Sequence, residues 1–154
     1  MALAAAATAQ PHMPHIWGEF GRSGALSRQS ELVEIATGGK RRGTAFHYRL
    51  RLTIKDGNEV VGMKWADSSW CPAVQTVVHD MLNVTMPFPE PSGSPDASRV
   101  MVVDSASYHL KSPTNWPMGD ITITSNVGSP LAKRVDGALK QLASCWTDDV
   151  EGAG

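Results

Sequence analysis

Residues 44–54 (TAFHYRLRLTI) form the most regular alternation of apolar and polar side chains in the sequence. One side of the pattern carries Phe46, Tyr48, Leu50, Leu52 and Ile54, and the other carries His47, Arg49, Arg51 and Thr53. A repeat of two residues predicts a β-strand with one face on a core and the other face exposed. Asp56-Gly57-Asn58 then predicts a tight turn, and residues 60–65 the returning strand of a hairpin. The chain should therefore be built around an antiparallel sheet.

Three other segments have the character of strands. Residues 32–37 (LVEIAT) precede the hairpin and are joined to it by the loop GGKRRG, and residues 120–125 (DITITS) alternate as a short strand. The stretch 72–86 is ambiguous, because five of its apolar residues also sit at helical spacing: Val74, Val77, Val78, Met81 and Leu82. Its β-branched residues and the alternation over 83–86 favour a strand over residues 76–86.

Two N-cap signatures predict helices. Ser94-Pro95-Asp96 combines a capping side chain, a proline and an early acid, which predicts a helix over residues 95–110. Ser129-Pro130 repeats the signature before an apolar stripe, which predicts a helix over residues 129–146. The expected fold class is therefore α+β, an antiparallel β-sheet with helices packed on one face and the other face open.

The length of 154 residues and a composition of 42% hydrophobic and 19% charged residues are typical of one globular domain. We expect a flexible arm at 1–14, the sheet and first helix at 15–110, an extra strand at 111–128 and the C-terminal helix at 129–146. Apolar runs stay far below the roughly 20 residues that cross a bilayer, so no membrane partner is expected.

The residues that carry catalysis or bind metals in other proteins are scattered here. The five histidines have no cysteine or paired carboxylate at ligand spacing, so no metal site is predicted. Asp104 and Ser105 would point different ways on the expected helix, which argues against a catalytic triad with His109. Cys71 and Cys145 lack a CxxC partner and are predicted to be free thiols, with a bond between subunits as the alternative. No enzyme and no cofactor is predicted.

The charge of the chain is unevenly distributed although its formal net value is only −1. Residues 38–55 carry six basic residues and no acid, whereas acids gather at the C-terminal end: Asp148, Asp149 and Glu151. A basic band on a nearly neutral protein indicates one face that meets phosphate groups.

The polar side of the strand at 44–54 is the predicted nucleic-acid surface. Guanidinium groups bind phosphate bidentately, and a strand spaces alternate side chains about 7 Å apart, near the repeat of a nucleic-acid backbone. A second polar row on the strand expected at 76–86, and a lysine on the hairpin, extend this surface. The predicted RNA-binding residues are His47, Arg49, Arg51, Thr53, Lys64, His79, Asn83 and Thr85. The alternative is that these residues form an ordinary solvated face of a sheet.

Four stretches resemble the coat proteins of single-stranded RNA bacteriophages, the levivirus-like family. They are Trp17 followed by GRSG at 21–24, the LVEIAT strand with the hairpin KRRGTAFHYRLRLTI, the segment HDMLNVTMPFPE, and the capped helix after SGSPD. The family's RNA-contacting positions match the residues predicted above on the strands at 44–54 and 76–86. The loop at 66–73, which holds Cys71, resembles the loop around the shell's symmetry axes, where some relatives place cysteines that bridge subunits.

The resemblance implies a homodimer whose two sheets join edge to edge, with helices locked across the outer face. The inner face would bind single-stranded genomic RNA, and the dimers would assemble in the host cytoplasm into the shell of a virion. A permuted subtype moves its first strand to the C-terminus, a place that residues 120–125 could fill. The helix at 129–146 has no counterpart in the family.

Two other functions compete with the coat protein. One is a small regulator that binds nucleic acid or a protein without forming shells, and it predicts a discrete small oligomer. The other is a small α+β enzyme with a pocket around His79 or His109, for which the sequence offers no supporting signal.

Overall fold

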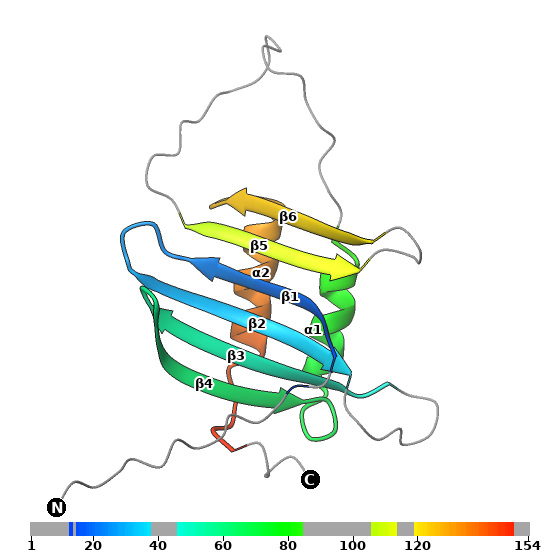
Figure 1. Ribbon diagram of the computed structural model, residues 1–154. Helices are drawn as coiled ribbons and strands as arrows, with labels where there is room; N and C mark the ends of the chain where they lie inside the picture. Colours follow the sequence, from blue (N-terminus) through cyan, green and yellow to red (C-terminus); the bar gives the residue numbers. More distant parts are fainter. Residues whose placement is uncertain (1–12, 14, 38–45, 85–105, 114–118, 150–154) are drawn as a thin grey trace, which may run out of the picture.

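A computed structural model describes residues 13, 15–37, 46–84, 106–113 and 119–149. These residues form six strands and two helices (Figure 1). The strands are β1 (Ile16–Ser23), β2 (Gln29–Thr37), β3 (Tyr48–Asp56), β4 (Glu59–Asp67), β5 (Ser107–Pro113) and β6 (Asp120–Asn126), and the helices are α1 (Ala73–Leu82) and α2 (Pro130–Gln141).

The strands form one antiparallel sheet in the order β4-β3-β2-β1-β5-β6. The first four strands follow one another as a meander, and β5 then pairs with the other edge of β1. Both helices lie behind the sheet in the view of Figure 1, so they cover the same face. The α+β class, with helices on one face of an antiparallel sheet, is therefore confirmed, although α1 is not one of the helices predicted.

The hairpin predicted from the alternating segment is present as β3 and β4. Gly57 makes the turn with a φ of 59°, a left-handed value that glycine adopts without a steric penalty, and its amide donates to the carbonyl of Arg28 at 2.7 Å. The strand predicted at 32–37 is longer and begins at Gln29. The strand predicted at 44–54 begins only at Tyr48, so His47 precedes it.

The main hydrophobic core lies between the helices and one face of the sheet, and a smaller buried cluster of Met13, Ala36 and Trp65 lies on the opposite face. Helix α1 buries Val74, Val77, Val78 and Met81, and α2 buries Leu131, Ala132, Val135 and Ala138. The sheet contributes Phe20, Val33, Ile35, Leu50, Leu52, Ala66, Tyr108 and Leu110 to the same cluster. These sheet residues alternate along their strands with side chains of the opposite face.

The helix predicted from the second N-cap signature is confirmed in position but is shorter than expected. Ser129 Oγ accepts a hydrogen bond from the Ala132 amide at 3.0 Å, and Pro130 opens the helix. Helix α2 ends at Gln141 rather than 146. Beyond it, the backbone of Thr147 pairs with Trp65 and covers part of the outer edge of β4.

The strand predicted at 76–86 is wrong, because residues 73–82 form α1. The helical spacing of the buried valines and Met81 decides the outcome, since it lets all four side chains enter the core at once. Burial outweighs the modest helix cost of β-branched residues. Residues 85 and 86 lie outside the described part of the chain.

The helix predicted at 95–110 is wrong at its C-terminal end. Residues 107–110 belong to β5, in which Tyr108 and Leu110 are buried and alternate with His109 and Lys111. Strand β5 pairs with β1 on one side and β6 on the other, and these distant partners supply its backbone hydrogen bonds. A capping pattern reports only on neighbouring residues and does not predict such pairing. Residues 95–105 lie outside the described part of the chain.

The prediction of free thiols is also wrong. Cys71 and Cys145 form a disulfide within the chain, with their Cα atoms 5.8 Å apart and a sequence separation of 74 positions. The bond joins the segment before α1 to the turn after α2. Because Cys71 is paired with Cys145, it is not the bridge between subunits that the resemblance suggested.

Candidate nucleic-acid interface

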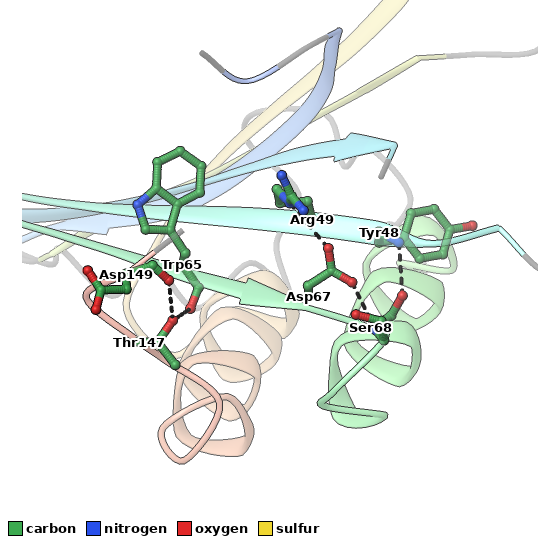
Figure 2. Close-up of polar contacts among 8 residues, drawn as sticks. Tyr48, Arg49, Trp65, Asp67, Ser68, Thr147 and Asp149 are labelled. Atoms are coloured by element: carbon green, nitrogen blue, oxygen red, sulfur yellow. Dashed lines mark hydrogen bonds and ion pairs between the residues drawn. The ribbon is translucent and has the colours of Figure 1, made fainter. Parts of the chain in front are cut away.

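The face of the sheet opposite the helices holds part of the predicted RNA-binding set. Leu50 and Leu52 of β3 point into the core, so Arg49, Arg51 and Thr53 lie on the other face. Figure 2 shows the Trp65 ring on the side of the strands away from both helices. We call this surface of the six strands the open face.

The strand register places one row of side chains across the open face. Arg51 on β3 lies opposite Trp65 on β4 and opposite Glu34 on β2. The row continues from Glu34 to Glu19 on β1 and then to Lys111 on β5. Arginine, two carboxylates and lysine thus follow one another across the sheet.

Arg51 is held by Glu34 in a bidentate ion pair. Its Nε donates to Oε2 at 2.7 Å and its Nη2 donates to Oε1 at 2.8 Å. The two side chains are only 19% and 13% exposed, and the Arg51 Cζ atom lies 5.9 Å from the centre of the Trp65 ring. The guanidinium is therefore fixed in orientation, and its charge is largely neutralised.

Arg49 of β3 is held more loosely, by Asp67 at the end of β4 (Figure 2). Its Nε donates to Asp67 Oδ2 at 3.2 Å, while the other carboxylate oxygen accepts the Ser69 amide at 2.8 Å. Within the described residues, Arg49 uses only its Nε in hydrogen bonding. Both of its Nη groups therefore keep donors that an oxygen ligand could accept.

The strands balance their charges on the open face. The basic side chains there are Arg49, Arg51, Lys55 and Lys111, and the acidic ones are Glu19, Glu34, Asp67 and Asp120. Lys111 approaches Asp120 to 3.5 Å between Nζ and Oδ2. The described strands therefore do not present the unbalanced basic band that the sequence of residues 38–55 indicated, although residues 38–45 are outside the described part.

The predicted RNA-binding residues divide between the two faces of the sheet. Arg49, Arg51 and Thr53 lie together on the open face, and Thr53 is only 7% exposed between Leu32 and Met63. Lys64 is in register with the core residue Leu52, so it lies on the helix side and not on the face that carries Arg51.

The second polar row, predicted on a strand at 76–86, does not form, because residues 73–82 are helical. His79 is exposed on α1, with its ring 6.2 Å from that of Tyr48, and Asn83 Nδ2 donates to the His79 carbonyl at the end of the helix. Helix α1, which holds His79 and ends at Asn83, covers the face of the sheet opposite to that of Arg49 and Arg51. Thr85 is outside the described residues.

Several residues of the open face were missed by sequence reasoning. Glu34 and Trp65 come next to Arg51 only through strand pairing, and His109 and Lys111 lie on the same face of β5, beyond β2 and β1. The alternation within LVEIAT points Glu34 away from the buried Val33 and Ile35, so its place on the open face could have been predicted from the sequence. The pairing of Glu34 with Arg51 was not available, because it depends on the register of β2 against β3.

A second group of charges lies on the helix side and links β1 to α2. Arg22 donates to Glu31 at 2.6 Å and to Asp136 at 2.7 Å, and the Tyr108 hydroxyl donates to Asp136 at 3.1 Å. Burial by itself would lower the pKa of Arg22, but hydrogen bonds and attraction to the two carboxylates raise it. The pKa of Tyr108 is raised by burial and by Asp136, against the opposing effect of Arg22. These contacts fasten α2 to the sheet.

Among the described residues, groups of three or more His, Cys, Asp or Glu side chains suited to a metal ion do not occur. Neither α1 nor α2 has the length and apolar character of a membrane-spanning helix. Comparison with known proteins found no family model, no curated protein and no solved structure that matches this chain.

Proposed function

We propose that the protein is a coat protein that forms homodimers, assembles into a virus-like shell and binds single-stranded RNA through the open face. The observation that supports this most directly is the one-sided placement of α1 and α2, which leaves the strands' polar face with Arg49 and Arg51 side by side. The sequence resemblance to levivirus-like coat proteins points to the same face.

RNA would be held mainly by the two arginines. As alternate residues of one strand they lie about 7 Å apart, which suits successive phosphates of an extended backbone. Arg49 has donors to spare, and the arginine at position 51 is supported from one side by the Trp65 ring. His109 and Lys111 extend the surface across β5.

The free edge of β6 is the proposed dimer contact. At the other end of the sheet, β4 is partly covered by Thr147, whereas the outer edge of β6 has no strand partner among the described residues. Exposed apolar side chains, Leu82 at 47% and Ile121 at 48%, lie beside that edge around a hollow of about 160 Å³. Pairing β6 with β6 of a second copy would continue the sheet and bury these side chains.

The assembly is tested by expressing the chain in bacteria and examining the purified protein by negative-stain electron microscopy and by its 260/280 nm absorbance ratio. Uniform particles that contain nucleic acid are expected. A small oligomer without RNA would contradict the proposal, and a discrete small oligomer that binds RNA would favour a regulator that forms no shell.

RNA binding is tested by the double variant R49Q/R51Q. Loss of the phosphate contact at Arg49, together with the contribution of the restrained Arg51, should weaken binding of a labelled single-stranded RNA of about 20 nucleotides and reduce the slope of log affinity against log salt by about one. Fluorescence anisotropy over about 50–300 mM KCl measures both quantities.

The control is K133Q/K140Q, which removes two exposed positive charges from α2 on the helix side. It changes the net charge equally but should leave the affinity within about twofold of the original. Equal losses in the two variants would contradict a binding site on the open face.

A further inference from the structure

We infer that Glu34 sets the strength of RNA binding by occupying the bidentate face of Arg51 that a phosphate would otherwise take. This inference rests on the proposed function and identifies the regulating residue of the same site.

The geometry makes Glu34 a direct competitor of phosphate. A carboxylate and a phosphate both offer two oxygens to the same pair of guanidinium N–H donors. Glu34 already accepts from Nε and Nη2 of Arg51, at 2.7 and 2.8 Å. Phosphate can form the same fork only if Glu34 gives up both hydrogen bonds.

The surroundings of Glu34 oppose that exchange. Its side chain is 13% exposed, so a released carboxylate would gain little contact with water. On its other side it lies directly opposite Glu19 of β1, whose like charge disfavours an unpaired Glu34. A phosphate at Arg51 would also approach both carboxylates. Arg49 differs, because its contact with Asp67 uses a single donor at 3.2 Å.

The two arginines therefore contribute unequally. Arg49 is available to RNA at once, and Arg51 is restrained by Glu34. Replacing Glu34 by Gln keeps the shape of the side chain but removes its charge, which should release Arg51 for phosphate. Affinity for single-stranded RNA should rise about tenfold, and the salt slope should steepen by about one.

The chain offers a matched control on the same strand. Glu31 is three residues away on β2, faces the helix side and pairs with Arg22 at 2.6 Å. Glu31→Gln makes the same change in net charge but leaves Arg51 paired, so it should change RNA affinity less than about twofold. In the double variant E34Q/R51Q, the gain produced by Glu34→Gln should disappear.

The experiment measures anisotropy of a fluorescein-labelled oligouridine of about 20 nucleotides with the original protein and the three variants, after circular dichroism has verified their folding. Tighter binding by Glu34→Gln alone supports the inference. Suppose that the original protein binds RNA but Glu34→Gln binds no more tightly than Glu31→Gln. This result would overturn the inference and keep the proposed function. Failure of every protein to bind would overturn both. If Glu34→Gln does not fold, Glu34→Thr removes the same charge with a residue suited to strands.

Discussion

Gly21 lies in β1 opposite His109 of β5, where the backbone of β2 and the His109 imidazole leave no room for a side chain. A Cβ atom at this position would meet the carbonyl oxygen of Glu31 and would come within 2.9 Å of His109 Cε1. The glycine is thus needed for the close approach of β1 to its neighbours rather than for a turn. The sequence shows Gly21 only as the first residue of a GRSG motif. The register of β2, β1 and β5 explains why a glycine is needed there.

Gly21→Ala should destabilise the protein by about 2–3 kcal/mol, because β1 must shift away from β2 to admit the methyl group. Urea unfolding followed by circular dichroism measures the change. Gly137→Ala is the control, since a Cβ there meets nothing within 4 Å among the described atoms and alanine favours a helix by about 1 kcal/mol. If the two variants have equal stability, the packing argument for Gly21 is wrong.

Helix α1 shows how an element can be misjudged from its own residues. Its valines favour a strand locally, but their spacing places Val74, Val77, Val78 and Met81 on one side, where they cover the sheet. The correction moves His79 and Asn83 away from Arg49 and Arg51. The expected RNA surface therefore reduces to β3 and its neighbours.

Strand β6 is the element whose free edge the proposed dimer needs. A lysine at an edge disfavours pairing with another chain, since its charge would be buried in the contact. Ile121→Lys should therefore convert the dimer to a monomer, and sedimentation velocity measures the change. Leu26→Lys, at a residue 84% exposed between β1 and β2, is the control and should stay dimeric. A dimeric Ile121→Lys protein would place the contact elsewhere.

For the whole molecule, the disulfide joins the two helical segments that cover the sheet. It links residues separated by 74 positions, and closing a loop of this length in the unfolded chain corresponds to about 4 kcal/mol of stability. Cys145 is 2% exposed and packs in the main core. The bond therefore fastens the end of α2 to the start of α1 across that core.

The variant C71S/C145S should lose about 4 kcal/mol of unfolding free energy in urea titrations. Original protein treated with a reductant should approach the variant, because both then lack the cross-link. Alkylation of the unreduced, folded protein at either cysteine would show that the bond is absent in solution and would contradict this prediction.

The sequence by itself determined the local features of this protein: the β3–β4 hairpin, the inward and outward directions along β3, the capped start of α2 and the α+β class. These follow from alternation, turn residues and caps, which act over a few neighbouring residues. Only the tertiary structure decided that α1 is a helix, that residues 107–111 pair with β1, that Cys71 meets Cys145 and that Arg51 meets Glu34. Each of these depends on contacts between distant parts of the chain, whose register and burial no local pattern specifies.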